Sequence, residues 1–430
     1  MFQAALLNLW RHRRRTLFTG LVCSAAMTAV LLGAGFALFT YQSLAEKAAR
    51  DLGHLTLSHP EYFLDNEDVP LQHGIHRDPA LEKRLLARDD VKAVLPRLQF
   101  SGLVSNGEKS TIFLGSGVDG SEFQLKGPFL QIKTGGVLPP AYLNKPDDSI
   151  PLMIGEGLAA ILKAKVGSEL SLMSATSTGA LNALDVVVVG IFSTGVPDLD
   201  KRQLYLPIQA GQQLLQSDKI SELNIYLLHD QQQAELAAAL KNELQDTHEN
   251  ELQDTHVAPN QATQDTHLTS PIQVTPWQDR AFVYKAVRDL YNRIFGTLGI
   301  LMLLLVLFAV GHGISQVVTE RTREIGTMAA LGERRSRIVS NFVLEALLLG
   351  AFSAVVATLS TLLCCELLRQ FEVMMPPPPG SSQGYPLMIS FSAELTLYAG
   401  LVLMVVCMLF AFKASLSAAR KPLVDALGFV

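Results

Sequence analysis

Long apolar stretches separated by polar segments dominate the pattern of the chain. Four stretches are apolar enough to cross the ~30 Å hydrocarbon core of a bilayer as helices. They are Leu17–Phe39, Ile294–Val318, Ile338–Cys365 and Leu395–Phe412, interrupted by little besides His312 and Glu345. We therefore predict transmembrane helices at 17–39, 291–318, 338–365 and 393–413, the second continued backwards without a break through Tyr284–Arg293.

Basic residues near the ends of these stretches predict their orientation, because Lys and Arg favour the cytoplasmic side. They precede the first stretch, fill the 319–337 loop and follow the fourth stretch, whereas the 366–392 loop has only Arg369. We expect cytoplasmic segments at 1–16, 319–337 and 414–430, and extracytoplasmic segments at 40–290 and 366–392. A cleaved signal peptide is the alternative for the first stretch, but its apolar part is longer than the usual ~7–15 residues.

The polar segment 40–290 mixes strand-like and helix-like patterns. The β-branched run Asp185–Phe192 (DVVVVGIF) predicts a buried strand. Apolar positions on one side of Pro79–Asp89 and of Gln231–Leu244 predict amphipathic helices. The expected fold class is an α-helical membrane domain of four helices, one before and three after an inserted α+β extracytoplasmic domain of two lobes.

Small residues recur at every fourth position of the first stretch and would let another helix approach closely in lipid. The alternative is that small residues are common in membrane helices. We predict a packing or dimer face formed by Ala25, Ala29, Gly33 and Ala37.

Composition adds little chemistry. Charged residues make up 17 % of the chain, below the ~25 % of ordinary soluble proteins. A net charge of −5 gives no sign of a nucleic-acid surface. The four cysteines form neither a disulfide framework nor a metal spacing, although a redox-active Cys364–Cys365 pair is the alternative.

A direct repeat interrupts the polar segment. Asn242–Glu249 (NELQDTHE) is followed at once by Asn250–Val257 (NELQDTHV), and QDTH returns at Gln264–His267. We interpret 242–267 as a tolerant surface loop. A metal site from His248, His256 and His267 is the alternative, but flexible repeats do not preorganise ligands, so no metal site is predicted.

The loop Glu320–Arg337 (ERTREIGTMAALGERRSR) reads as a short helix with Glu320 and Glu324 at its N-terminal end and Gly332 as a C-terminal cap. A charged connector would explain its arginines but not an apolar stripe outside the bilayer. Such a stripe suits docking on a cytoplasmic partner. It consists of Ile325, Met328 and Ala329.

Catalytic motifs are not recognisable. No Walker A motif occurs, and Gly107–Thr111 lacks its glycines and Gly-Lys step. The apolar stretches hold few polar groups for a solute path. For Glu345, a bond to a neighbouring helix is favoured over a place in such a path. We predict a non-enzymatic chain without a cofactor of its own.

The sequence ERTREIGTMAALG closely resembles the loop of FtsX-like permeases, the type VII ABC transporter superfamily that includes macrolide-exporter permeases. Further resemblances follow the family order along the chain. They are Asn8–Gly20, Gly190–Leu215, Phe342–Gly350 with Glu345, and Ala419–Leu427. Asp51–Phe63 (DLGHLTLSHPEYF) is most similar to lipoprotein-releasing permeases. Macrolide exporters normally carry a fused N-terminal ATPase, and only fifteen residues precede the first apolar helix here.

The resemblance implies a bacterial inner-membrane permease that transmits ATP-driven motion of a separate ATPase dimer to a periplasmic domain. ATP and Mg would bind that partner, and a second permease copy or paralogue would complete the membrane part. Lipoprotein release with a periplasmic carrier is implied. The alternatives are efflux with a periplasmic adaptor and control of a cell-wall hydrolase or envelope-stress signalling. The implied ATPase-docking residues are Glu320, Arg321, Arg323, Glu324, Ile325, Gly326, Met328, Ala329, Leu331 and Gly332.

Overall fold

The computed structural model describes residues 13–64, 68–127, 130–140, 149–254, 272–371, 373–375 and 385–420. The described residues form two compact units. The helical unit contains the residues up to Ser43, Val287–Met375 and those from Tyr385 onwards. The sheet unit contains the described residues of Leu44–Ala286.

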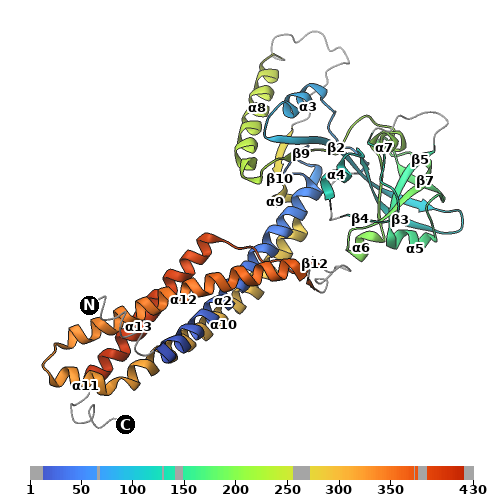
Figure 1. Ribbon diagram of the computed structural model, residues 1–430. Helices are drawn as coiled ribbons and strands as arrows, with labels where there is room; N and C mark the ends of the chain where they lie inside the picture. The colour runs from blue at the N-terminus through green and yellow to red at the C-terminus, as the bar shows by residue number, and fades with distance from the viewer. Residues whose placement is uncertain are drawn as a thin grey trace. The chain divides into compact units, whose positions relative to one another are not determined.

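Helices long and apolar enough to cross a membrane are the main elements of the helical unit (Figure 1). The described part of the chain contains four: α2 (Arg13–Leu52), α10 (Phe282–Glu320), α12 (Arg335–Phe371) and α13 (Ala393–Ala419). The four predicted helices are present with the length and composition that a membrane span needs, and the continuous helix from Tyr284 is confirmed. The short helix α11 (Thr322–Ala330) connects α10 to α12, and the two-residue strands β11 (Met374–Met375) and β12 (Tyr385–Pro386) pair between α12 and α13.

Close backbone contacts hold α2, α12 and α13 together. Ser24 Oγ donates to Ser353 O at 3.1 Å, and Ser353 Oγ donates to Gly20 O at 3.2 Å. A Cβ added at Gly350 would lie 3.3 Å from Met404 Cα, so α13 crosses α12 at a position where only glycine fits comfortably. In lipid, such small-residue contacts and hydroxyl bonds replace the hydrophobic effect as the source of packing energy.

The predicted small-residue stripe contributes only part of this packing. A Cβ at Gly33 would lie 3.3 Å from Met302 Sδ, so Gly33 faces α10. Ala37 is half-buried, but Ala25 and Ala29 are exposed. Within the chain, the stripe therefore packs at Gly33, and the role of Ala25 and Ala29 in a packing or dimer face stays a prediction. The apolar side chains of α2 that reach the interior instead are Cys23, Met27 and Leu31.

A mixed sheet forms the centre of the sheet unit. Its order is β10-β1-β9-β2-β3-β8-β5-β7-β4, and β6 pairs with both β2 and β7. The β3–β8 and β5–β7 pairs are parallel, and the other pairs are antiparallel. The strands are β1 (Leu55–Ser58), β2 (Val91–Ser105), β3 (Ser110–Val118), β4 (Gln131–Gly135), β5 (Ile150–Gly155), β6 (Glu169–Ala175), β7 (Leu181–Ser193), β8 (Gln203–Pro207), β9 (Glu222–Leu227) and β10 (Gln273–Pro276).

Helices pack on this sheet and confirm the mixed α/β character of the domain. They are α3 (Pro79–Leu86), α4 (Glu122–Lys126), α5 (Glu156–Leu162), α6 (Pro197–Asp200), α7 (Ile208–Leu215), α8 (Gln233–Asp254) and α9 (Trp277–Arg280). The predicted strand Asp185–Phe192 lies in β7, where Val186, Val188 and Phe192 are buried. The division into two lobes stays a prediction, because one sheet runs through the described strands.

The direct repeat does not form a loop throughout. Helix α8 continues to Asp254, so the loop prediction is wrong for 242–254. The physical reason is composition, since Glu, Leu and Gln are good helix formers and the repeat contains neither Gly nor Pro. Residues 255–267, including His256 and His267, and the side chain of His248 lie outside the described part.

Candidate functional site

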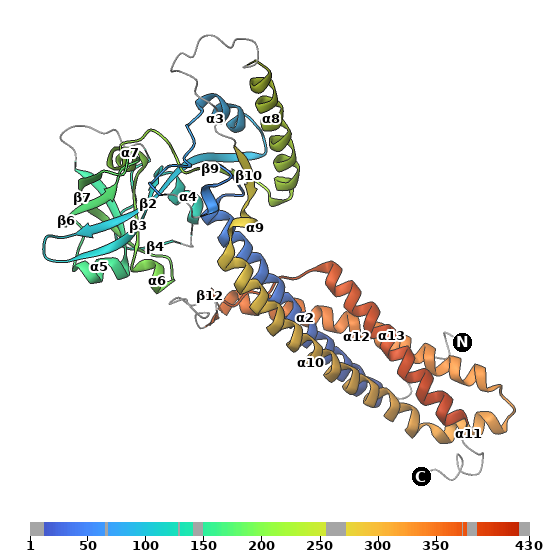
Figure 2. The ribbon, with the colours of Figure 1, turned by 180° about the vertical axis from the view of Figure 1, so that it is seen from behind.

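Helices α2 and α10 each have residues in both units, and they contact each other within each unit (Figure 2). In the helical unit, Tyr41 Oη donates to Asn292 Oδ1 at 2.6 Å, and Phe295 packs edge-on against Phe36 with centroids 5.9 Å apart. In the sheet unit, alanines of α2 pack against aromatic and small residues of α9 and α10. This second contact contains Ala45, Ala48, Ala49, Leu52, Trp277, Ala281 and Tyr284.

Buried ion pairs attach the ends of these two helices to the sheet. Arg97 in β2 donates to Glu122 Oε1 at 2.6 Å and to the main-chain oxygen of Asp51, in the last turn of α2, at 2.6 Å. Arg280, the last residue of α9, pairs with Glu222 in β9. Glu222 and Glu122 are at most 1 % exposed. The outer ionic cluster consists of Asp51, Arg97, Glu122, Lys126, Glu222 and Arg280.

Lys126 connects two carboxylates of the cluster and the Tyr205 hydroxyl. Its Nζ lies 3.2 Å from Glu122 Oε1, 3.1 Å from Asp51 Oδ1 and 3.0 Å from Tyr205 Oη. Burial alone would lower the pKa of this ammonium, but Tyr205 and the Asp51 and Glu122 carboxylates raise it well above its ordinary value. Lys126 therefore stays charged and holds α4 to α2 and β8.

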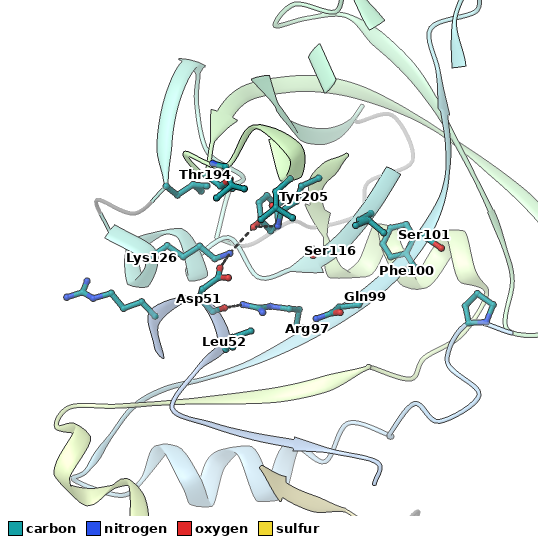
Figure 3. Close-up of a pocket in the computed structure, with 18 of the residues that line it drawn as sticks. Asp51, Leu52, Arg97, Gln99, Phe100, Ser101, Ser116, Lys126, Thr194 and Tyr205 are labelled. Carbon is teal, nitrogen blue, oxygen red and sulfur yellow. Dashed lines mark hydrogen bonds and ion pairs between the residues drawn. The ribbon is translucent and has the colours of Figure 1, made fainter. Parts of the chain in front are cut away.

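A pocket of about 730 Å³ opens beside the outer ionic cluster (Figure 3). The labelled side chains of Asp51, Lys126 and Tyr205 gather on one side of it, and Phe100 lies on another. Its wall carries four basic side chains, at positions 47, 50, 97 and 126, against two acidic ones, Asp51 and Asp68. Such a mixed, partly apolar concavity is the kind of site that binds a small ligand or a segment of a protein.

A second ionic cluster lies where α10 gives way to α11. Arg321 Nε donates to Glu324 Oε2 at 2.7 Å, and its Nη1 pairs with Glu345 of α12. The guanidinium also lies 4.7 Å from the ring centroid of Phe342. Burial alone would lower the pKa of Arg321, but the Glu345 and Glu324 carboxylates raise it above its ordinary value. The predicted structural bond of Glu345 is confirmed, and Arg321, Glu324 and Glu345 form the inner ionic cluster.

The apolar stripe of α11 faces the protein rather than a partner. Ile325 is 1 % exposed and packs against Val318, Ile338 and Phe342, with Met328 and Ala329 partly buried beside it. The expectation of an exposed stripe is therefore wrong at Ile325. The reason is that α12 and α13 extend to the level of α11 and cover its apolar side, a tertiary contact that the local pattern does not reveal.

The exposed face of α11 is the opposite one. Its residues are spaced by four, three and one, which places them on one side of a helix. They are Arg323, Thr327, Ala330 and Leu331, the last of them 89 % exposed. Glu320 and Gly332 are exposed at the two ends, whereas Gly326 is buried. The predicted cap is confirmed, because Gly332 follows α11 with φ of 84°.

The sequence did not predict the outer ionic cluster. A usable signal was present, since Arg97 and Glu222 stand inside otherwise apolar strands, VLPRLQF and ELNIYLL. Charged residues in such positions are seldom buried unless they are paired. The members of the cluster, however, come from five elements that lie far apart along the chain.

Helices α10 to α13 and the loop after α10 lie in a segment that matches a known family, which supports a permease subunit of an ABC transporter. Residues 296–423 match the family described as FtsX-like permease C-terminal. The resemblance to FtsX-like permeases found in the sequence is confirmed over this segment, and the similarity to lipoprotein-releasing permeases stays a prediction. No curated protein matches the chain.

Two solved structures are similar to about half of the chain at low identity. The periplasmic region of MacB from Actinobacillus actinomycetemcomitans is 15 % identical, with a TM-score of 0.37, and the match covers 56 % of this chain and 96 % of that one. The extracellular domain of the noncanonic ABC-type transporter YknZ from Gram-positive bacteria is 16 % identical, with a TM-score of 0.30, covering 51 % and 98 %. Both TM-scores lie below 0.5.

Proposed function

We propose that this chain transmits motion driven by a separate ATPase to an outer domain that handles cargo, without conducting a solute itself. The attachment of α10 near both of its ends, with α2 attached at one, carries the proposal. At one end, Asp51 and Arg280 are tied into the sheet by the outer ionic cluster. At the other, Arg321 directly after α10 is tied to α11 and α12 by the inner ionic cluster. A displacement of α11 would therefore pull on α10.

The ATPase would dock on the exposed face of α11 and supply ATP and Mg binding, so the chain itself would be non-enzymatic. Arg323 and Leu331 would make the contact, and Ile325 would support it from within. The two states of the ATPase must differ in their contacts with α11, because equal contacts would shift nothing.

A second permease copy or paralogue would cover membrane helices that this chain leaves open. Within the chain, only 11 % of the apolar window of α10 is buried, against 39 % for α12. Ala25 and Ala29 on α2 are also exposed and offer a small-residue surface. Lipid would cover the remainder.

The proposed setting is a bacterial inner membrane, with one span before and three after a periplasmic domain of two lobes and with both termini in the cytoplasm. The proposed cargo is lipoprotein, released towards a periplasmic carrier. The basic, partly apolar pocket beside Lys126 would suit a segment of cargo or carrier. Efflux with a periplasmic adaptor is the second candidate, and regulation of a cell-wall hydrolase or of envelope-stress signalling is the third.

Copurification from cells that express the neighbouring genes tests the docking face. Arg323→Glu combined with Leu331→Asp should abolish recovery of an ABC ATPase that the wild type retains. Lys413→Glu is the matched control, because it also inverts an exposed basic residue on the proposed cytoplasmic side. An ATPase that survives the double substitution would exclude this face. Absence of any ATPase with the wild type, despite its expression, would favour the regulatory function.

A further inference from the structure

Two histidines and a glutamate meet in the segment that connects β1 to α3. The ligand atoms of His59, Glu61 and His73 all lie within 4.8 Å of one another. His73 Nδ1 is 3.5 Å from Glu61 Oε2, and the two imidazole rings stack with centroids 5.0 Å apart. These residues belong to neither ionic cluster and do not line the pocket described above.

The sheet fixes both histidines from separate points of the chain. His59 directly follows β1, whose last residue Ser58 pairs with Gln273 of β10. His73 lies two residues before Ile75, which forms a bridge with Ile220 through two main-chain hydrogen bonds of 2.9 Å. The histidines are therefore held by the scaffold rather than placed by a freely moving loop, as a preorganised ligand set requires.

The three donors suit a zinc ion. Two imidazoles and one carboxylate are a ligand set that zinc uses when a fourth position is open to water or another ligand. Zn–N and Zn–O bonds of about 2.0–2.2 Å place tetrahedral donors roughly 3.4 Å apart. Zinc binding therefore requires the donors to move closer together and the stacked rings to rotate until both ring planes point at the ion. His59 Nδ1 accepts the Glu61 main-chain N–H at 3.2 Å, and zinc at this nitrogen would replace that long hydrogen bond.

The exposure of the two side chains indicates which side of a bound zinc ion would face solvent. The side chain of His73 is 14 % exposed, whereas that of Glu61 is 60 % exposed. Zinc would thus have protein on the histidine side and solvent on the glutamate side. The fourth ligand would come from water or from a group on another molecule.

We propose that His59, Glu61 and His73 form a zinc site that joins the two ends of the β1–α3 connection. The turn η1 (Tyr62–Leu64) follows Glu61 at once. In η1, the Phe63 ring lies 4.6 Å from the guanidinium of Arg280, a member of the outer ionic cluster. A bound ion would therefore fix an aromatic contact to the attachment of α9 and leave a coordination position facing outwards.

Metal titration of the full-length chain in detergent tests the site. The protein is stripped with a chelator, freed of any histidine tag and titrated calorimetrically with ZnCl₂. We expect one zinc ion per chain at this site. His59→Ala and His73→Ala should each weaken binding by more than about tenfold, since even indirect partners of a metal ligand change affinity by 10–100-fold. Glu61→Gln should weaken it in the same direction.

Two controls separate this site from other histidines. His76→Ala removes an exposed histidine of the same segment, which lies near Asp218, and should leave zinc affinity unchanged. Replacing His248, His256 and His267 together by alanine removes the repeat histidines and should also leave it unchanged. Cobalt provides a second readout, because a four-coordinate Co²⁺ site absorbs visible light far more strongly than the hydrated ion.

Several results would overturn the proposal. They are unchanged affinity in the His59→Ala, His73→Ala double variant, loss of binding in the repeat variant instead, or no zinc binding by the wild type. Folding is checked by the emission of the buried Trp277, with Trp10→Phe as background. A ligand variant with native emission and lost zinc binding supports the site, and native emission with zinc retained contradicts it.

Discussion

The outer and inner ionic clusters perform the same structural task with different degrees of enclosure. In the outer cluster, Glu222 is fully buried and accepts from Arg97, Arg280 and Asn224. In the inner cluster, Arg321 has two carboxylate partners, and the Glu324 side chain is 46 % exposed. The difference indicates that the outer cluster is enclosed by the sheet unit, whereas the inner cluster has one partner, Glu324, that solvent can reach.

The largest expected effect comes from opening the outer cluster. Glu222→Gln leaves Arg97 and Arg280 buried without their shared carboxylate, which should lower the free energy of unfolding of the sheet unit by about 3–5 kcal/mol. Chemical denaturation followed by Trp277 emission measures this. Glu243→Gln, which breaks an exposed pair with Arg84 at 2.8 Å, should cost about 0–1 kcal/mol. Equal losses in both variants would contradict the distinction.

Opening the inner cluster should have a smaller and more local effect. Glu345→Gln removes one of the two carboxylates on Arg321, and a charged hydrogen bond contributes about 1.5–3 kcal/mol. Hydrogen exchange of the α11 amides should accelerate roughly tenfold or more, while that of β2 and β9 stays unchanged. Glu366→Gln on the same helix breaks only an exposed pair with Arg369 at 3.2 Å and should leave α11 unaffected. Faster hydrogen exchange across the whole chain would mean that the inner cluster contributes to global stability as the outer cluster does.

A substitution at Gly332 tests whether the C-terminal cap stabilises helix α11. Gly332→Ala forces a side chain into a φ of 84°, although a Cβ there meets nothing within 4 Å. The expected loss is about 1 kcal/mol and purely conformational. Gly299→Ala, also in open space but within α10, should be neutral or slightly stabilising. The measurement is hydrogen exchange of the α11 amides in the two variants. Identical exchange rates would exclude a stabilising role for the cap.

The smallest expected effect is the contribution of His54 to the pH dependence of stability in the sheet unit. Burial lowers the pKa of His54, and its 2.7 Å contact with Asp230 offsets only part of this. The unfolded chain then binds more protons than the folded one, so the stabilisation is complete above pH ~6.5 and decreases as the pH falls through the lower folded value. The slope for one group is at most about 1.4 kcal/mol per pH unit. His54→Gln should flatten the dependence of thermal unfolding in this range, and His76→Gln should not.

The sequence was sufficient for elements whose pattern is local and long. The four membrane helices, the β7 strand and the Gly332 cap follow from runs of neighbouring residues. Contacts between distant segments were not predictable in this way. Ile325 lies against α12 and α13, and Glu345 finds its partner 24 residues earlier in the chain. The prediction of a loop at the repeat was wrong for another reason. A polar repeat without Gly or Pro can continue a helix as readily as it can form a loop.

The length of α2 has a mechanical consequence. Its 40 residues span about 60 Å at 1.5 Å per residue, roughly twice the ~30 Å hydrocarbon core. A helix of this length that crosses such a core extends beyond the lipid for about half of its length. Tilting the whole 60 Å rod by about 5° about one end displaces the other end by roughly 5 Å, about one helical turn. A small change at one end of α2 would then become a larger displacement at the other, with no change in the helix itself.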